Sequence, residues 1–459
     1  MTIVDAQPAA PFEDLAEALT GAVITPDDPD WDTARLAWNL AADQHPNAVA
    51  VPRNADDIIA VVRFANEHGL RVAAQGTGHQ ALALGDLAGS ILVHTSAFTE
   101  LHVDAGSRRA RAGAGVIWNT VSAALHEHGL AGLAGSAGDV GVVGYLLGGG
   151  YSWLGRQHGL AASSVTAIEL VTGDAEFRRV DADNDAELFW ALRGGGGNFG
   201  VVTAIEFEAV AVSDVYAGML LFPLEKAAEL LELFDRETAG MDERATLCAR
   251  LLHLPPMPDL PDALRGKAFA GLDGAINASD AEAAALLEPF VALGPVMNTF
   301  ARMPATSLVQ IHMDPPMPVP GVGDGVILDE LPPGAIEAIL DAAGDGVQTP
   351  LLLVDVRMLG GALSRRDPRG GAVDSLPGHC LVYTIGIAPS PEAAQAVEAA
   401  AASLISSLEP WRAQRDYANF AETDRRAEAL YSDDALERLR AVKRRVDPAD
   451  IIRGCHPLG

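Results

Sequence analysis

The sequence predicts an α+β protein built from more than one domain, and three observations lead to this fold class. Strand and helix patterns alternate along the first 212 residues of the 459-residue chain. From residue 213 to residue 408, proline clusters and Ala/Glu-rich helix patterns separate the strand patterns, which indicates a second α+β domain. The tail, residues 409–459, contains a charged helix pattern. With 49% apolar residues, the chain can fill both cores.

The elements of the first part follow from periodicity and from signals at their ends. A strand at 48–51 stops at Pro52, and a helix at 55–68 has Asn54 as its expected N-cap and Gly69 as its stop. The other elements predicted for this part are strands at 71–75, 91–94, 101–103, 110–112, 167–171 and 201–207, and helices at 116–128 and 186–192.

Proline clusters mark the second part, at 255–256 and again at 315–318. In the tail, a helix at 435–445 is expected to stop at Asp447, because a residue that precedes proline is disfavoured in helical conformation. The elements predicted for the second part are strands at 351–358 and 380–387 and helices at 227–234, 281–287 and 391–408.

Charge and cysteine usage exclude several classes of protein. The net charge of −30, from 62 acidic and 32 basic residues, argues against nucleic acid and anionic membranes as partners. Cys248, Cys380 and Cys455 have no metal-ligand spacing, so no metal site is expected. The chain starts without a signal-peptide pattern and has no apolar run long enough to span a bilayer. We therefore expect a cytoplasmic protein.

Two glycine-rich tracks are the most informative motifs. The first, Gln75-Gly76-Thr77-Gly78-His79-Gln80, holds a single histidine, and the second runs from Gly135 to Tyr151. Glycine leaves backbone N–H groups uncovered, and runs of such groups form concave anion sites. Two tracks in one domain suit a long cofactor that carries a diphosphate, and His79 is then the chemically reactive residue of the loop.

Further motifs surround these tracks in a fixed order. They are Ala50-Val51-Pro52, the His79 loop, Gly113-Ala114-Gly115, and the segments 144–151, 156–160, 188–194, 198–203, 417–420 and 438–448. This set resembles the flavin domain of the vanillyl-alcohol oxidase superfamily, and more closely the berberine-bridge-enzyme-like FAD-linked oxidases. The resemblance covers residues 38–210 and the chain from residue 416 to its end, and it leaves the middle part unmatched.

The resemblance implies a two-domain PCMH-type flavoprotein. Residues 1–212 and 409–459 would form the FAD-binding domain, and residues 213–408 would form an inserted α+β substrate-binding domain over the flavin ring. The resemblance also implies that FAD is bonded covalently to His79. Many relatives add a second bond from a cysteine where this chain has Ala137, so we expect a covalent bond through His79 only.

The resemblance also supplies the residues expected to bind FAD. The pattern Gly195-x-Gly197-x-x-Gly200 follows a predicted helix and enters a predicted strand, which is the wrong order for a Rossmann turn. We interpret it as backbone beside the adenosine half of FAD. The expected cofactor-binding residues are Gln75, Gly76, Thr77, Gly78, His79, Gln80, Gly135, Ser136, Asp139, Val140, Gly141, Gly144, Tyr145, Gly148, Gly149, Tyr151, Asn198, Gly200, Val201, Tyr417 and Asn419.

The catalytic base is harder to predict, because Phe420 stands where many alcohol-oxidising relatives carry a tyrosine. Phenylalanine has no titratable group. The candidates for catalytic residues are Tyr417 on the same segment, His312 in the middle part, and Tyr145 beside the flavin track. Two further possibilities are His253 and Tyr383, although histidines and tyrosines at such positions are more often structural.

The predicted function is an FAD-dependent oxidase. It would transfer hydride from a small organic substrate (an alcohol, sugar, amine or secondary metabolite) to the flavin, and O2 would reoxidise the flavin to give H2O2. The resemblance places Val140 near flavin C4a, where its small side chain leaves room for O2.

The alternative is a flavin-containing cyclase of natural-product biosynthesis with structural FAD, since Phe420 removes the expected phenol. A noncatalytic flavin-binding protein ranks last. We expect a monomer or a homodimer.

Overall fold

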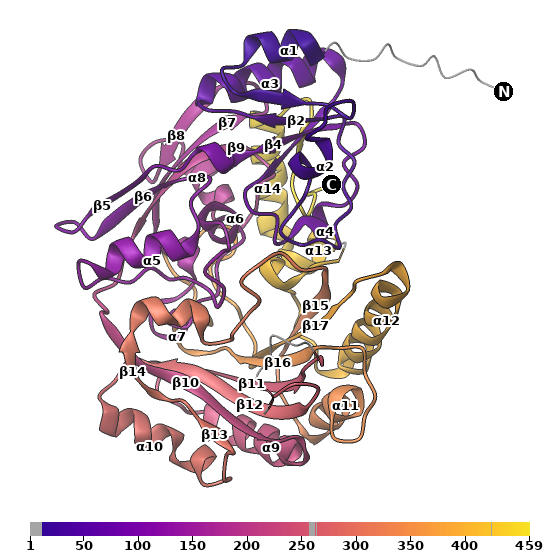
Figure 1. The fold of residues 1–459 in the computed structure, drawn as a ribbon. Helices are drawn as coiled ribbons and strands as arrows, with labels where there is room; N and C mark the ends of the chain where they lie inside the picture. Colours follow the sequence, from indigo (N-terminus) through magenta and orange to yellow (C-terminus); the bar gives the residue numbers. More distant parts are fainter. Residues whose placement is uncertain (1–11, 257–261, 263, 424) are drawn as a thin grey trace.

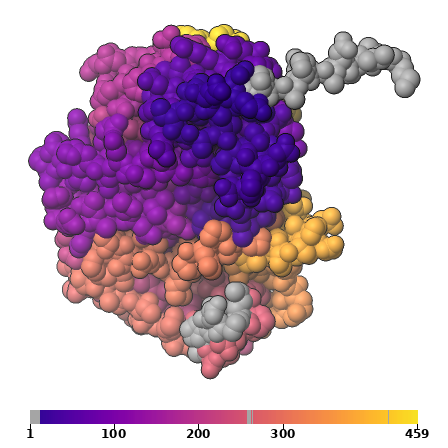
Figure 2. Space-filling model, turned by 45° about the horizontal axis from the view of Figure 1, so that its top comes forward, coloured from indigo at the N-terminus to yellow at the C-terminus, as the bar shows by residue number. Residues whose placement is uncertain are grey.

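The computed structural model describes residues 12–256, 262, 264–423 and 425–459. The chain folds into two parts that stack on each other (Figure 1). The first part and the C-terminal tail form one of them, and the middle of the sequence forms the other. Figure 2 shows the same division on the surface, with the early residues in indigo to magenta and the middle residues in orange.

The first sheet of the upper part is mostly parallel. Its strand order is β1-β2-β4-β3-β18, and only the β1–β2 pair is antiparallel. Two helices pack on it through buried side chains such as Leu15, Ile58 and Val61. The elements are β1 (Ala22–Ile24), β2 (Ala48–Val51), β3 (Arg71–Gln75), β4 (Ser90–His94) and β18 (Ile452–Arg453), with helices α1 (Phe12–Ala18) and α3 (Ala55–His68) and, in the connecting loops, α2 (Trp31–Ala34) and α4 (Ala81–Leu84).

The second sheet of the upper part is antiparallel, in the order β5-β6-β9-β7-β8. Trp118, Phe199 and Phe207 are fully buried in the core that this sheet shares with its helices. The elements are β5 (Leu101–Asp104), β6 (Arg109–Gly113), β7 (Val165–Thr172), β8 (Phe177–Asp181) and β9 (Gly200–Glu208), with α5 (Trp118–His126), α6 (Val142–Leu147), α7 (Gly155–His158) and α8 (Ala186–Leu192).

The C-terminal tail returns to the upper part. Its helix α14 (Asp433–Val446) buries Leu436, Leu439 and Val446 in the core of the second sheet. The last strand, β18, then pairs in parallel with β3, with Ile452 opposite Val72. A short helix, α13 (Ala427–Leu430), precedes α14. The tail therefore adds a helix to the core of the second sheet and an edge strand to the first sheet.

One large antiparallel sheet, in the order β13-β10-β12-β11-β16-β17-β15 with β14 beside β10, forms the lower part. Four helices cover a single face of this sheet, through residues such as Phe234, Phe290, Ile339 and Leu404. The elements are β10 (Asp214–Pro223), β11 (Ala245–His253), β12 (Ala268–Ile276), β13 (Met297–Asn298), β14 (Ala301–Pro304), β15 (Gly321–Leu328), β16 (Leu353–Met358) and β17 (Cys380–Ile387), and α9 (Ala227–Thr238), α10 (Asp280–Val291), α11 (Pro333–Ala343) and α12 (Pro391–Ser407).

The alternation of side chains along these strands decides what faces the upper part. On β16, Val354 and Val356 enter the helix-covered core, so Asp355 and Arg357 lie on the opposite face. In the same way, Val382 of β17 is in the core and Tyr383 is on the other face. A row of polar side chains is thereby directed away from the helices.

The predicted fold class is confirmed: the protein has two domains, with an α+β domain inserted into the first. None of the helices among the described residues is long and apolar enough to cross a membrane. Four long strands of the lower part, β10, β11, β12 and β15, were not predicted from the sequence.

Candidate active site

A cavity of about 430 Å³ lies where the two parts meet. Its upper wall consists of the two glycine tracks and the C-terminal residues Arg453 to His456, and its lower wall of side chains from β16, β17 and the segment after Tyr417. The predicted cofactor residues that line it are Gln75, Gly76, Thr77, Gly78, His79, Gln80, Gly135, Ser136, Val140, Gly141, Gly144, Tyr145, Gly148, Tyr151, Asn198, Gly200 and Asn419. Asp139, Gly149, Val201 and Tyr417 lie behind this surface.

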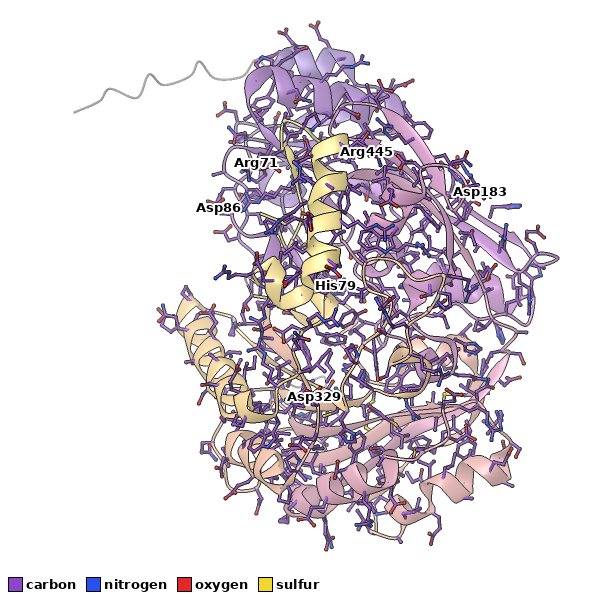
Figure 3. The ribbon with its side chains drawn as sticks, turned by 180° about the vertical axis from the view of Figure 1, so that it is seen from behind. Arg71, His79, Asp86, Asp183, Asp329 and Arg445 are labelled. Carbon is purple, nitrogen blue, oxygen red and sulfur yellow. The ribbon has the colours of Figure 1, made fainter. Side chains whose placement is uncertain are left out.

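Strand β3 ends at Gln75 and delivers His79 to the cavity. Gly78 has φ +85°, and a Cβ there would come within 2.8 Å of the Ala37 side chain, so only glycine fits. The His79 ring stacks on Trp38 with 4.0 Å between centroids and 20° between planes. In Figure 3 His79 lies close to the boundary between the two parts.

Asp139 connects the two stacked rings. Trp38 Nε1 donates to Asp139 Oδ2 at 2.6 Å, and Asp139 Oδ1 lies 3.5 Å from His79 Nε2. Burial lowers the pKa of His79 below its ordinary value, and the nearby Asp139 carboxylate opposes this effect. His79 is therefore a mostly neutral imidazole at neutral pH, with a defined neighbour at one of its two nitrogens.

The second glycine track is held by the segment Tyr417–Phe420, which follows helix α12. A Cβ on Gly148 would lie 1.6 Å from Asn419 Oδ1, and one on Gly149 would lie 2.9 Å from Tyr417 Oη. Asn419 Nδ2 also donates to Tyr145 O at 3.0 Å. Tyr417 and Asn419 therefore fix the backbone of the track.

FAD fits this cavity. A Cβ on Gly144 or on Gly197 would meet nothing within 4 Å, although both residues line the cavity, so the space in front of their backbone is open. Asn198 Nδ2 donates to Gly195 O at 2.9 Å and to His456 O at 3.1 Å, which ties the Gly195–Gly200 turn to the C-terminal segment. The two glycine walls together offer room for an extended dinucleotide.

The catalytic candidates Tyr145 and Tyr417 and the cofactor-binding candidate Tyr151 lie in or beside the glycine tracks, and the Tyr417 hydroxyl has no hydrogen-bond partner among the described residues. Tyr145 Oη donates to Leu133 O at 2.9 Å, and Tyr151 Oη donates to Met358 O at 2.9 Å. The buried Tyr417 lies against the glycine track, outside the cavity lining. Burial raises the pKa of all three phenols above the ordinary value of 10.0.

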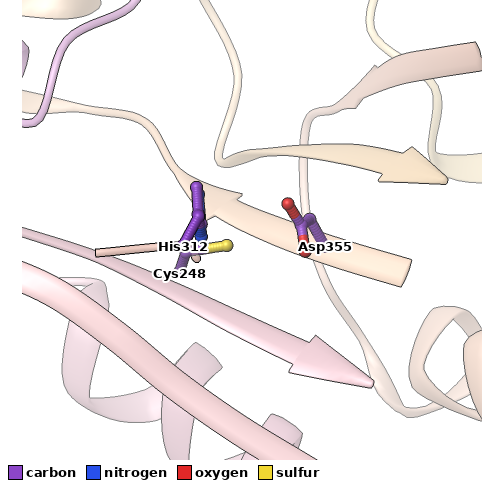
Figure 4. Close-up of side chains that lie close together, drawn as sticks. All are labelled: Cys248, His312 and Asp355. Atoms are coloured by element: carbon purple, nitrogen blue, oxygen red, sulfur yellow. The ribbon is translucent and has the colours of Figure 1, made fainter. Parts of the chain in front are cut away.

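His312 lies on the turn after the short helix Ala305–Gln310 and packs against side chains of β11 and β12. Its Nδ1 lies 2.7 Å from Asp273 Oδ2, and burial lowers its pKa well below 6.5. Figure 4 shows Cys248, His312 and Asp355 together, and their potential ligand atoms lie within 4.8 Å of one another.

Two arginines already donate hydrogen bonds to the two carboxylate oxygens of Asp355, the acidic residue of this cluster. Arg250 Nε donates to Asp355 Oδ1 at 2.8 Å, and Arg357 Nη2 donates to Asp355 Oδ2 at 2.7 Å. Arg250 Nη1 also donates to Asp273 Oδ2 at 3.1 Å. Because guanidinium groups stand where a metal ion would have to bind, we interpret the cluster as a buried ion-pair network.

The structure brings together a pair of residues that sequence reasoning did not join. Tyr383 Oη donates to Glu422 Oε1 at 2.5 Å, and both residues line the cavity. The Tyr383 ring meets the edge of Phe420 at 5.3 Å, and the Arg357 guanidinium lies 4.9 Å above the Phe420 ring. The sequence named Tyr383 among the possible bases, but it did not indicate Glu422, which stands two residues after Phe420.

Cys455 is a further lining residue that the sequence did not indicate. Its Sγ lies 3.8 Å from Gln80 O, and burial raises the pKa of its thiol to about 11. Ala137, at the position where relatives carry a cysteine, also lines the cavity.

Comparisons with known proteins agree with this geometry. A family model described as an FAD binding domain matches residues 46–181. (R)-6-hydroxynicotine oxidase of Paenarthrobacter nicotinovorans is 30% identical over 242 residues, 49% of this chain and 53% of that protein. Glucooligosaccharide oxidase of Sarocladium strictum is 32% identical over 187 residues, 40% of this chain and 38% of that protein. The chain thus spans about half or less of the curated relatives it matches.

Solved structures extend the likeness of fold over nearly the whole chain. BBE-like 1 of Physcomitrella patens has a TM-score of 0.84 at 19% identity, covering 97% of this chain and 99% of that one. 6-Hydroxy-D-nicotine oxidase of Arthrobacter nicotinovorans has a TM-score of 0.82 at 22% identity, covering 94% and 96%. The chain therefore contains an FAD binding domain over residues 46–181 and shares its two-domain fold with these solved structures.

Proposed function

We propose that this protein is an FAD-dependent oxidase of a small organic molecule. The observation that carries the proposal is a single cavity that runs from the His79 loop to the polar side chains of the inserted domain. FAD bound there would supply a two-electron acceptor for a substrate hydride and would pass the electrons to O2, giving H2O2.

The lower wall supports a substrate of mixed character. Leu353, Ile385 and Ile387 give it an apolar surface, and Arg357, Tyr383 and Glu422 supply convergent polar groups. Amines, sugars, alcohols and secondary metabolites all fit this description. Val140 lines the same cavity from above, and its short side chain supports access for O2.

We propose that FAD is attached covalently through His79 alone. The carboxylate of Asp139 near Nε2 favours a proton on that nitrogen, which leaves the lone pair on Nδ1. Cys455 offers no comparable nucleophile, because a thiol with a pKa of about 11 is protonated at neutral pH. We further propose a cytoplasmic location, which the scattered, free cysteines at 248, 380 and 455 support. A monomer or a homodimer is the oligomeric state we propose.

A cyclase that keeps FAD as a structural group is the second candidate. The observation that favours it is the phenyl ring of Phe420 in the cavity lining, where it brings no titratable group. Such an enzyme would fold its substrate by proximity and would leave the flavin oxidised.

Anaerobic mixing separates the two candidates. The purified protein is mixed without O2 with 6-hydroxynicotine, xylobiose, glucooligosaccharides and chitooligosaccharides, and the flavin absorbance is followed. An oxidase substrate bleaches the flavin, and admitting air restores the colour and forms peroxide. Dithionite serves as the positive control for reduction. A compound that is consumed while the flavin spectrum stays unchanged would support the cyclase. Bleaching by dithionite but by no compound would contradict an oxidase of these classes.

A further inference from the structure

Glu422 and Tyr383 form a short hydrogen bond at the substrate side of the cavity. Tyr383 comes from β17 and Glu422 from the loop after Phe420, and the Oη–Oε1 distance is 2.5 Å. The second carboxylate oxygen, Oε2, is buried and has no hydrogen-bond partner among the described residues. A buried carboxylate that accepts only one hydrogen bond from a side chain binds a proton more tightly than an exposed carboxylate does.

The side chains around this pair carry both positive and negative charges. Burial raises the pKa of Tyr383 well above its ordinary 10.0, the neighbouring Glu422 adds to this rise, and Arg357 on β16 opposes it. Asp324 on β15 faces Glu422, whose N–H donates to Asp324 Oδ1 at 3.2 Å. Arg425 binds Asp324 at 2.6 Å. Burial, with a smaller contribution from Asp324, raises the pKa of Glu422 to about 7, and the Tyr383 bond opposes this rise.

The other candidate bases are unsuited to take a proton from a molecule in this cavity. The hydroxyls of Tyr145 and Tyr151 are engaged with backbone carbonyls, and Tyr417 and His312 are outside the lining. The phenol of Tyr383, by contrast, lies beside the ring of Phe420, at the edge of the same cavity.

We propose that Tyr383 and Glu422 are the proton-accepting pair of the oxidation, with Tyr383 as the catalytic residue that touches the substrate. The proposal rests on the proposed oxidase function. The substrate O–H or N–H bond breaks and its proton goes to Tyr383 Oη, while the Tyr383 proton moves to Glu422 Oε1. The adjacent C–H bond breaks as hydride, for which bound FAD would be the two-electron acceptor, and a C=O or C=N bond forms. Glu422 acts through Tyr383 and is a positioning residue.

The kinetic test uses Tyr383→Phe and Glu422→Gln, with Tyr216→Phe as a matched control on β10, where Tyr216 stacks on Phe300. The compound from the anaerobic panel that bleaches the wild type fastest is the probe, and the reduction rate is measured from pH 5.5 to 9. The wild-type rate should rise through the Glu422 pKa of about 7, because the ionised carboxylate accepts the proton. Tyr383→Phe and Glu422→Gln should reduce the rate by about a hundredfold or more, the usual contribution of general-base help.

The pH profile distinguishes this role from a structural one. Glu422→Gln should lose the rise near neutral pH, while its probe Kd, from the perturbed flavin spectrum, and its melting temperature stay near those of Tyr216→Phe. A Glu422→Gln variant that keeps the wild-type rate and inflection would overturn the proposal. If no compound bleaches the wild type, the oxidase proposal has failed instead.

A substrate-free measurement tests the pair in either case. Titration of ¹³C-carboxyl-labelled glutamate by NMR, assigned with Glu422→Gln, should show Glu422 titrating near pH 7. Tyr383→Phe should move this titration to higher pH, because the phenol bond favours the ionised carboxylate. A Glu422 that titrates near its ordinary value of 4.5, or that does not respond to Tyr383→Phe, would contradict a shared proton.

Discussion

The two walls of the cavity differ in what they are made of. The upper wall is largely backbone, because glycines from two tracks leave the main chain uncovered, and Tyr417 and Asn419 pack against this backbone. The lower wall is made of side chains that alternate out of a sheet, supported by the Arg250–Asp355–Arg357 network. A backbone wall suits a fixed cofactor, whereas a side-chain wall can change with the substrate. Binding of FAD and choice of substrate are therefore separable properties of this fold.

The largest effect expected on the upper wall is the release of the flavin by His79→Ala. If FAD is bonded through His79 alone, acid precipitation of the wild type leaves the yellow colour in the pellet, and precipitation of the variant leaves it in the supernatant. Cys455→Ser is the matched control and should keep the colour in the pellet. Free FAD in the wild-type supernatant would contradict the covalent bond.

On the lower wall, Arg250→Met should produce the largest loss of stability. It leaves the buried carboxylates Asp355 and Asp273 short of a partner, and breaking a buried pair costs about 3–5 kcal/mol. Arg445→Met is the control, since Arg445 forms an exposed pair with Asp185 worth about 0–1 kcal/mol. Arg445 lies on the outer helix α14 (Figure 3). Thermal melts should show a large decrease for the first variant only; equal decreases would show that the network adds no special stability.

The two walls also differ in how far the sequence could predict them. The glycine tracks were predicted because their function is local: a short motif supplies the backbone that FAD needs. Strands β12 and β15 were missed because Gly274, Gly323 and Gly325 give them the appearance of loops. Their pairing, of β12 with β11 and of β15 with β17, makes them strands, and no local pattern of these glycine-containing segments shows it.

The Tyr383–Glu422 pair escaped prediction for a related reason. The two residues are 39 positions apart, and their contact exists only because β17 and the segment after Phe420 meet at one edge of the cavity. No spacing rule connects them. Likewise, nothing in the sequence shows that the hydroxyls of Tyr145 and Tyr151 are taken up by backbone carbonyls.

A smaller effect is expected from Gly148→Ala, which tests whether the backbone wall tolerates a single methyl group. Its Cβ would collide with Asn419, and overpacking of this kind costs about 1–3 kcal/mol. The ratio of flavin to protein absorbance should fall, because Asn419 must leave the track. Gly240→Ala, whose Cβ meets nothing within 4 Å, is the control. Full flavin content in Gly148→Ala would show that the track can shift without loss of the cofactor.

The last prediction concerns the stability of the lower wall as a function of pH. Glu422 has a pKa of about 7 in the folded protein against an ordinary 4.5, so the folded state holds this proton more tightly than the unfolded state. Its contribution to stability therefore falls as pH rises from 4.5 through 7, where the ionised carboxylate becomes the dominant form. Asp273, with its pKa raised to about 6, acts in the same direction and is retained in the variant. Glu422→Gln should gain stability relative to the wild type between pH 5 and pH 8, measured as the difference in denaturant midpoints at each pH. A difference that does not change over this range would mean that Glu422 is already ionised at pH 5, and that burial has not raised its pKa.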